Sequence, residues 1–293
     1  MPSPRTPAES VRLMQRETAS HHGRVPRTLG GHDLGPGCRA FIDGQFILLT
    51  SSGFGYHYRP GAGITIERPG AGFDPDEEAL WLNGSVYAAA ACLNGFYPVH
   101  ASAVAYQGRA YAFTGASGAG KSTLIAGLGQ RGWPMFCDDT LLLDLSDPAQ
   151  VTALPGHKRL KLTDHALELT GTAAQQPVGA DTGKSYVLPP AGDWTEPLPL
   201  GALVFLEEGA PAGWAAIGGA ERFARLADDH YTQDLYAEAQ RPARGALFAL
   251  RADFARRVPM ARLTRPRSPA GFDASLDLAE ANLTRLHEEL RHP

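Results

Sequence analysis

The sequence predicts an α/β protein in which a small, β-rich α+β domain precedes a larger α/β domain. Three observations support this fold class. Short strand-like runs between glycine, proline and Asp-Gly turns occupy residues 40–66, and an apolar helix-like segment follows over 79–93. From residue 99 onward, strand-like and helix-like segments alternate. The 33 glycines and 23 prolines among 293 residues predict many turns and short elements.

The overall composition is that of a globular protein, and it limits the functional classes. Hydrophobic residues make up 43% of the chain and charged residues 20%, which excludes disordered, collagen-like and coiled-coil sequences. The formal net charge of -4 does not attract a phosphate backbone, so we expect no nucleic-acid partner. The longest apolar run, 86–93, is too short to cross a bilayer, so we expect no membrane association. The three cysteines lack C-x-x-C spacing, which indicates neither a zinc site nor a disulfide framework and favours the reducing cytoplasm.

The first part of the chain predicts a flexible tail and a small domain. Residues 1–24 mix proline, serine, arginine and histidine with little apolar periodicity, which is typical of a flexible, mildly basic tail. Residues 25–95 predict the small α+β domain. It contains a β-meander and a buried helix, which begins after an acidic first turn and ends at an Asn-Gly pair. The strand-like runs lie at 40–49, 53–58 and 64–66, and the helix lies at 79–93.

Residues 96–293 predict the larger α/β domain. Its first two strand-like runs flank Gln107-Gly108, which is typical of a hairpin turn. A glycine-rich segment, a helix and a short strand follow, and this strand ends in two aspartates. The expected strands lie at 99–106, 109–114, 135–137, 141–145, 159–162, 200–206 and 258–263, and the expected helices at 121–131, 164–169, 220–239 and 272–290.

A phosphate-binding loop is predicted between the second hairpin strand and the helix after it. The pattern G-x-x-x-x-G-K-[ST] is typical of loops whose backbone N–H groups surround phosphate oxygens at the positive end of a helix. Lys121 is expected to contact the β- and γ-phosphates, and the Ser122 hydroxyl to ligate Mg²⁺. The strand, loop and helix context disfavours the alternative, a glycine-rich turn without a ligand. The residues expected to bind nucleotide are Gly115, Ala116, Ser117, Gly118, Ala119, Gly120, Lys121, Ser122 and Thr123.

Two adjacent carboxylates follow the next strand. Beside a bound nucleotide, Asp138 could hold the metal while Asp139 accepts the proton of an incoming hydroxyl group. The alternative for this pair is a turn or a helix cap. His100 lies at the start of a strand-like run, where a histidine is more often a structural group than a catalytic one.

Two further groups of charged residues have ordinary alternatives. Four basic residues beyond the loop could hold a triphosphate or an acidic peptide end, although such residues usually form a solvated face. The run Asp228-Asp229-His230 lies in a helical pattern and is expected at the surface rather than at a metal. The four basic residues are Lys158, Arg159, Lys161 and Lys184.

Three segments together resemble the kinase domain of the HPr kinase/phosphorylase family. Residues 99–104, 113–123 and 131–139 match that domain in order and spacing as well as in sequence. The resemblance implies that residues 96–293 have the P-loop kinase fold of the HPr kinase C-terminal type and use ATP and Mg²⁺.

Site roles follow from the same resemblance, residue by residue. It implies phosphate and magnesium contacts for Lys121 and Ser122 and an active-site role for His100. It also implies a general base at Asp139 and a metal-side carboxylate at Asp138. The chain lacks a counterpart of the Glu-Val-Arg-Gly-Leu-Gly-Ile-like stretch of the bifunctional enzymes, so neither phosphorylase activity nor HPr as substrate is implied.

The function implied is that of a MgATP-dependent kinase that phosphorylates a serine-type hydroxyl on a peptide or small protein. As a whole, the chain is more similar to HPr-kinase-like proteins of peptide modification, which include kinases of the C-terminal serine of lasso-peptide precursors. Members of the wider family often assemble, which allows for a homo-oligomer.

Two alternatives stay open. The same fold serves small-molecule kinases, and phosphate loops also occur in nucleotide-binding regulatory proteins. Against a regulatory protein, the chain has neither an N-K-x-D guanine-reading motif nor an L-S-G-G-Q transporter signature. An aspartate pair is also not needed for nucleotide sensing alone.

Overall fold

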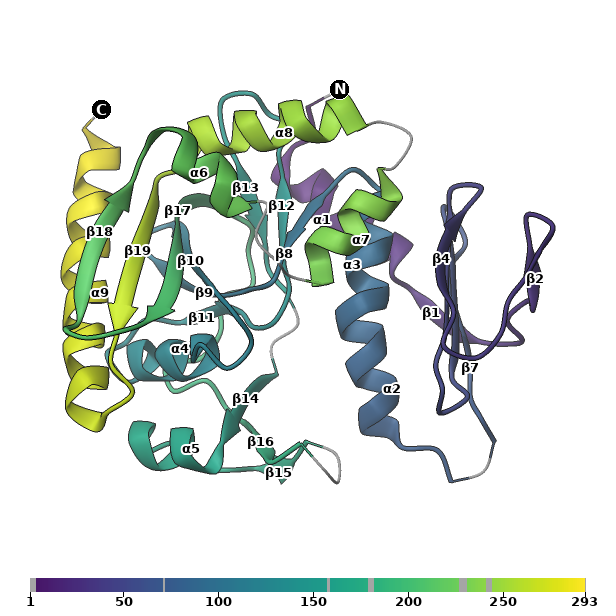
Figure 1. The fold of residues 1–293 in the computed structure, drawn as a ribbon, viewed down its shortest axis with the longest axis horizontal. Helices are drawn as coiled ribbons and strands as arrows, with labels where there is room; N and C mark the ends of the chain where they lie inside the picture. The colour runs from purple at the N-terminus through teal and green to yellow at the C-terminus, as the bar shows by residue number, and fades with distance from the viewer. Residues whose placement is uncertain are drawn as a thin grey trace.

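The chain forms two parts in the computed structural model, which describes residues 4–70, 72–156, 159–178, 182–226, 231–240 and 244–292. A five-stranded sheet lies in the smaller part and a nine-stranded sheet in the larger part. Figure 1 shows the two parts side by side, with helices α2 (Pro75–Trp81) and α3 (Tyr87–Leu93) between them. No helix within the described ranges combines the length and the apolar character that crossing a membrane requires.

Much of the predicted flexible tail is folded. Helix α1 (Pro7–Glu17) begins with a capping box between Thr6 and Glu9. Strand β1 (Ser20–His22) pairs in parallel with β7 (Gly63–Glu67). The tail prediction is wrong for these segments because the buried stripe of α1 holds a single large apolar side chain, which leaves little apolar periodicity to detect. The stripe consists of Ser10, Met14 and Glu17.

The five-stranded sheet contains the predicted meander, with β1 added at one edge. The meander is confirmed, because its four strands pair antiparallel in sequence order. A tight turn at Asp43-Gly44, where both residues have positive φ, divides the run 40–49 into two strands. The meander consists of β4 (Arg39–Ile42), β5 (Gln45–Leu49), β6 (Gly55–Arg59) and β7, and a separate two-stranded sheet consists of β2 (Thr28–Leu29) and β3 (His32–Asp33).

A long helix follows the meander and leads to the larger sheet. It consists of α2, the π-helical turn η1 (Leu82–Val86) and α3, which succeed one another without a break. Asp74 caps its N-terminus, where the carboxylate accepts a hydrogen bond from the N–H of Asp76 (2.9 Å). The helix prediction for 79–93 is confirmed. The expectation that this helix is buried is correct only for α3, because no residue of α2 is buried.

The larger sheet positions the glycine-rich loop. The predicted hairpin is confirmed, because β9 (Ala101–Tyr106) and β10 (Arg109–Thr114) pair antiparallel. Strand β10 also pairs in parallel with β17 (Leu198–Glu208), and β17 with β19 (Met260–Arg265). The C-terminal ends of these three strands therefore lie at one edge, which is where α/β sheets bind ligands. The other strands are β8 (Tyr97–Val99), β11 (Met135–Cys137), β12 (Leu141–Asp144), β13 (Thr152–Leu154) and β18 (Gly213–Ile217).

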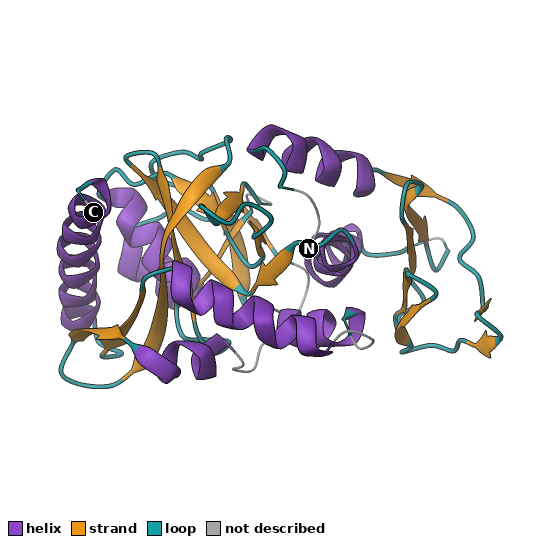
Figure 2. Cartoon of the chain, turned by 90° about the horizontal axis from the view of Figure 1, so that it is seen from above, coloured by secondary structure: helices purple, strands orange, loops and turns teal. Residues whose placement is uncertain are grey.

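Helices cover both faces of the larger sheet, as Figure 2 shows. Side chains alternate along β10, so Tyr111 and Phe113 join one core cluster while Ala110 and Ala112 join another. The first cluster includes side chains of α4 (Lys121–Gln130) and α9 (Pro269–Arg291), and the second includes those of α3, α6 (Gly219–Leu226), α7 (Tyr231–Ala239) and α8 (Arg244–Arg257).

A third sheet lies beside α4. Its strands pair in the order β14 (Leu160–Thr163), β16 (Lys184–Val187) and β15 (Gln176–Pro177), and helix α5 (Asp164–Thr170) follows β14. Side chains of β14 and α5 pack against α4 in the same core cluster. This sheet therefore brings residues 159–178 and 182–187 close to the glycine-rich loop.

Several elements differ from the sequence-based expectations. Helix α8 is not predicted, because its apolar side chains are spread around the helix instead of forming a stripe. Within the range 220–239, where one helix is predicted, the described residues form α6 and α7. The run Asp228-Asp229-His230, and also Lys158, lie outside the described residues.

Candidate active site

The glycine-rich loop leaves β10 at Gly115, where the backbone passes close to the neighbouring strand. A Cβ atom at this position would lie 2.7 Å from the carbonyl oxygen of Leu206 in β17, closer than non-bonded atoms approach. At the other end of the loop, Gly120 has a left-handed φ of +85° and caps α4. The backbone therefore requires both motif glycines. Residues 116–118 between them form an exposed tip.

The Lys121 side chain bends back over this loop. Its Nζ donates hydrogen bonds to the carbonyl oxygens of Gly115 (2.9 Å) and Ala116 (3.2 Å). Burial lowers the pKa of Lys121, which the charges of Asp138 and Asp139 oppose. The first N–H groups of α4 have no partner within the helix and lie at its positive end. Cation, loop and helix end together form a site suited to phosphate oxygens.

Asp138 is the carboxylate that contacts the loop helix. Its side chain accepts a hydrogen bond from Ser122 Oγ (2.9 Å to Oδ1) and another from Ser102 Oγ (2.5 Å to Oδ1). Burial raises the pKa of Asp138, whereas the two serine hydrogen bonds and the charge of Lys161 oppose this effect. Ser122 and Asp138, which the sequence predicts as metal ligands, thus lie within hydrogen-bond distance of each other.

These two side chains fit a magnesium ion. Both supply oxygen ligands, which Mg²⁺ prefers, and the ion would relieve the buried negative charge of Asp138. Within the described ranges there is no group of three or more histidine, cysteine or acidic side chains that could hold a metal by itself. A protein that supplies few ligands is typical of magnesium bound together with substrate phosphates.

Asp139 has an unusual backbone conformation. Three described non-glycine residues have positive φ, and two of them, Asp43 and Gln107, lie in hairpin turns. Asp139, with φ of +75°, follows β11 instead, and its side chain is 40% exposed. Such strain at a non-glycine residue is often found at functional sites. Because its side chain is 40% exposed, the Asp139 carboxylate is accessible to solvent and is not buried in the core.

His100 holds this aspartate from the adjacent strand end. The imidazole Nδ1–H donates a hydrogen bond to the backbone carbonyl of Asp139 (2.8 Å) and lies 3.3 Å from its Oδ1. The backbone carbonyl of His100 accepts a hydrogen bond from Thr114 Oγ1 (3.0 Å), at the end of the strand that leads into the loop. His100 thus links the aspartate to the start of the phosphate loop.

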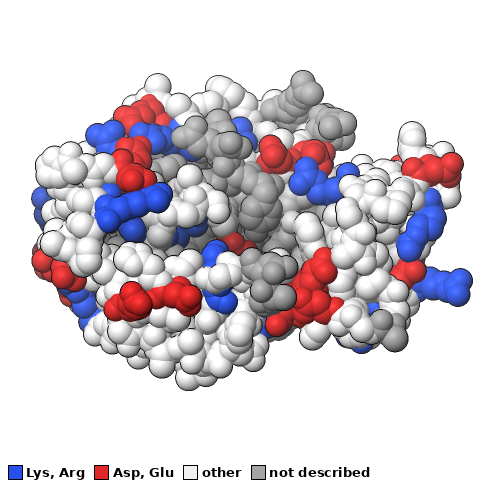
Figure 3. Space-filling view, turned by 60° about the horizontal axis from the view of Figure 1, so that its bottom comes forward, with Lys and Arg blue, Asp and Glu red and all other residues white. Residues whose placement is uncertain are grey.

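Three of the four predicted basic residues are described, and the third sheet brings them to the site. The guanidinium of Arg159 lies over the ring of Tyr186, 3.5 Å from its centroid. The positive charge of Lys161 opposes the rise in the pKa of Asp138, and the positive charge of Lys184 adds to the lowering of the pKa of Lys121. Figure 3 shows this side of the molecule, where acidic and basic side chains lie close to one another on the surface.

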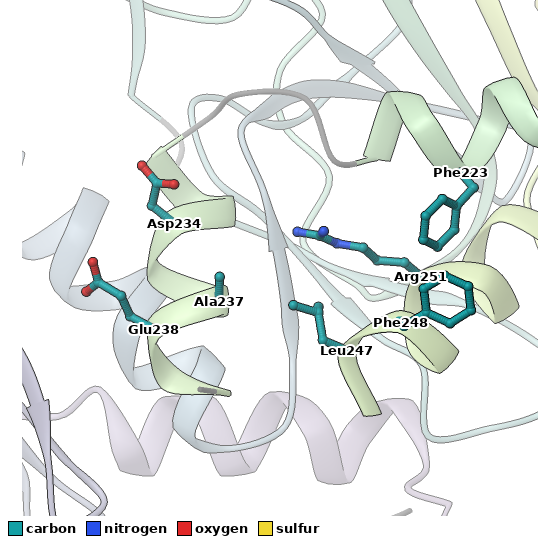
Figure 4. A pocket seen from close by; sticks show the side chains of 7 residues that line it. All are labelled: Phe223, Asp234, Ala237, Glu238, Leu247, Phe248 and Arg251. Carbon is teal, nitrogen blue, oxygen red and sulfur yellow. The ribbon is translucent and has the colours of Figure 1, made fainter. Parts of the chain in front are cut away.

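A pocket of about 450 Å³ lies away from this cluster, between α6, α7 and α8 (Figure 4). Arg251 extends into it from α8 and donates a hydrogen bond to Gln233 (2.9 Å). The walls carry Phe223 and Phe248, whose rings are 4.8 Å apart. None of the predicted site residues lines this pocket, and it has no phosphate-binding loop, so we do not assign the chemistry to it.

Sequence reasoning missed two residues that contact the predicted ones. Ser102 is a completely buried hydroxyl in a strand of otherwise apolar residues, and this pattern could have identified it. Arg265, at the end of β19, donates a hydrogen bond to the carbonyl of Gly120 (3.1 Å). No local signal marks Arg265, because its partner lies on a distant segment of the chain.

Comparison with known proteins finds distant structural similarity and no sequence relative. No protein-family model matches the chain, and no curated protein is significantly similar to it. Among solved structures, the Hpr(Ser) kinase/phosphatase from Coxiella burnetii is similar at 12% sequence identity and a TM-score of 0.33. The match covers 67% of this chain and 99% of that chain. It indicates a distant structural relationship only.

Proposed function

We propose that this protein is a kinase that transfers the γ-phosphate of MgATP to a serine-type hydroxyl on a peptide or small protein. The observation that carries the proposal is an accessible carboxylate beside a phosphate loop. Asp139 is 40% exposed, and its neighbour Asp138 is hydrogen-bonded to the serine of the loop motif. Phosphoryl transfer needs a held phosphate and a nearby base, and these residues supply both.

The loop and its lysine would hold the phosphates. When a triphosphate binds, Lys121 exchanges its two carbonyl partners for phosphate oxygens, which are stronger acceptors. Ser122 and Asp138 would hold Mg²⁺, which supplies neutralisation of the negative charge on the phosphates. Once Lys121 has made this exchange, the lysine and the N–H groups are oriented toward the phosphates, so little further reorganisation is needed when charge develops.

Asp139 would accept the proton of the acceptor hydroxyl. Its exposed side chain can meet an incoming hydroxyl, and His100 restrains its backbone through the 2.8 Å hydrogen bond. Asp138 is less suited to this role because it is buried and already accepts hydrogen bonds from two serines. The two carboxylates would thus divide metal binding and proton transfer between them.

The kind of phosphate acceptor is proposed from the sequence resemblance. The resemblance to kinases of peptide modification makes a peptide with a serine at its C-terminus, as in lasso-peptide precursors, our first candidate. We place the reaction in the cytoplasm, where ATP is available. Other serine-containing peptides and small proteins follow as candidates.

The test is transfer from γ-labelled ATP to a panel of serine peptides, with the phosphate located by mass spectrometry. We expect Asp139→Asn to bind a slowly hydrolysed ATP analogue as the wild type does, while transfer falls by ~10² to 10⁴, the usual contribution of a positioned base. Asp43→Asn is the matched control, because Asp43 also has positive φ but lies in a hairpin turn of the smaller part. Full transferase activity in Asp139→Asn would contradict the assigned role.

The same experiment separates the other functions. A small-molecule kinase would phosphorylate free serine or a hydroxylated metabolite in preference to every peptide. A regulatory nucleotide-binding protein would hydrolyse ATP slowly and label no acceptor.

A further inference from the structure

Asp138 and Asp139 also line a small pocket of about 20 Å³, here called the carboxylate-side pocket. None of residues 115–123 contributes to this pocket. One wall comes from the long helix that follows the meander, and the other comes from the third sheet. The wall residues include Leu80, Asn83 and Gly84 from the helix and Arg159, Lys161 and Tyr186 from the sheet.

A second pocket, of about 240 Å³, lies on the loop side. Gly118, Gly120 and Thr123 line it together with residues of α5 and α9, and neither aspartate does. Ser122, the neighbour of Thr123 in the sequence, is hydrogen-bonded to Asp138. Another pocket beside the loop, of about 430 Å³, is lined by Gly115, Ala116, Ser117 and Ala119, and neither aspartate lines it. In-line phosphoryl transfer requires the leaving and attacking oxygens on opposite sides of the phosphorus atom. The pockets beside the loop therefore suit the nucleoside, and the carboxylate-side pocket suits the acceptor.

The helical wall of the carboxylate-side pocket is irregular. Asn83 and Gly84 lie in the π-helical turn η1, a rare conformation that is frequent at functional sites. Leu80, one turn earlier, is 42% exposed and is among the few large apolar side chains that the described residues leave exposed. This wall thus presents an amide and an apolar group toward the site, which is suitable for contact with a peptide.

Arg159 is oriented on the opposite wall. Its guanidinium carbon lies 3.5 Å from the ring centroid of Tyr186, and one guanidinium nitrogen is 3.9 Å from a carboxylate oxygen of Asp76. The side chain is still 41% exposed, so part of the guanidinium is accessible. A guanidinium fixed in one plane binds a carboxylate through two parallel hydrogen bonds. Lys161, in the same lining, adds a second positive charge.

We propose that this pocket is the acceptor site, in which Arg159 binds a carboxylate close to the reacting hydroxyl and Asn83 contacts the acceptor chain. The proposal rests on the kinase function proposed above and extends it to the recognition of the substrate. The carboxylate belongs either to the C-terminus of the peptide or to an acidic side chain next to the serine. Asn83 and Arg159 are positioning residues and take no part in proton transfer.

The experiment uses the full chain and three ten-residue peptides of otherwise identical sequence. One ends in serine with a free carboxylate, the second ends in the same serine as an amide, and the third is the amide with aspartate before the serine. Arg159→Gln should raise the KM for the carboxylate-bearing peptide about 10-fold, the effect of losing one charged hydrogen bond. Asn83→Ala should raise it about 3- to 10-fold. Neither variant should change the Kd of an ATP analogue, and Arg159→Lys should recover part of the loss.

The outcomes distinguish a failure of the proposed acceptor site from a failure of the proposed kinase function. Arg285→Gln is the control, because Arg285 lies on α9 and its side chain is 64% exposed. A preference for the free acid assigns the carboxylate to the C-terminus, and a preference for the aspartate peptide assigns it to a side chain; either supports the site. If transfer proceeds and Arg159→Gln leaves the peptide KM unchanged, the acceptor site is overturned and the kinase stands. If the wild type binds the ATP analogue but labels no acceptor, both are overturned.

Discussion

The glycine before Lys121 can be tested against a second glycine of the same conformation. Gly120 and Gly132 have φ of +85° and +86° and lie at the two ends of α4. Forcing an L-residue into this left-handed region costs roughly 1–2 kcal/mol at either position. The surroundings differ, because a Cβ at Gly132 meets nothing within 4 Å.

At Gly120, the added Cβ would lie 2.5 Å from both terminal nitrogens of Arg265. The guanidinium must move away, and it then loses its 3.1 Å hydrogen bond to the carbonyl of Gly120. A hydrogen bond from a charged group contributes about 1.5–3 kcal/mol. We therefore expect Gly132→Ala to lower the free energy of unfolding by roughly 1–2 kcal/mol and Gly120→Ala by roughly 2.5–5 kcal/mol.

The measurement is urea unfolding of the two alanine variants, together with calorimetry of an ATP analogue. Only Gly120→Ala should weaken nucleotide binding, because it displaces the N-terminus of the loop helix. In the background of Arg265→Ala, the clash is absent, so Gly120→Ala should cost no more than Gly132→Ala. Equal losses for the two single variants would refute the argument, since they would show that Arg265 adjusts without cost.

Three further predictions concern the lysine, the acid stability and the helix packing. Lys121→Ala should weaken ATP-analogue binding about 10- to 100-fold in calorimetry and also lower transfer. Burial alone would raise the pKa of Asp144, but hydrogen bonds from an arginine and two serines outweigh it and leave the pKa below its ordinary value. The ionised carboxylate of Asp144 thus stabilises the fold above pH ~4, and this stabilisation is lost as the pH falls. Asp144→Asn should therefore lower the free energy of unfolding by about 2 kcal/mol at pH 7, and in acid the stability of the variant should approach that of the wild type. Gly127→Ala should lower the melting temperature, because the new Cβ would lie 2.7 Å from Phe272, whereas Gly245→Ala, with nothing within 4 Å, should raise it slightly.

The elements predicted correctly depend on neighbours in the sequence. The hairpin around Gln107-Gly108 and the meander of the smaller part follow from alternation and turn residues, which act over a few positions. The glycine-rich segment lies between a strand and a helix as expected, because consecutive residues of one segment build it, and its binding of phosphate stays a prediction. Helix α1 was missed since its buried positions include a serine and a glutamate, whose partners lie in other segments.

The surroundings of the carboxylates illustrate the opposite case. Ser102 and Asp138 are hydrogen-bonded across a sequence separation of 36 residues, and Arg265 reaches Gly120 across 145. No pattern within either segment encodes such a pair. The exposure of Asp139 and its positive φ likewise depend on how β11 meets its neighbours.

The glycine-rich loop and the aspartate pair can be read from the sequence, because both are local arrangements of residue types, and the proposed chemistry depends on them. The groups that surround them became visible in the folded chain, since Arg159, Asn83 and Arg265 reach the proposed site through the packing of distant segments. Chain connectivity sets local conformation, whereas burial and packing select the long-range partners, and the two together form the proposed site.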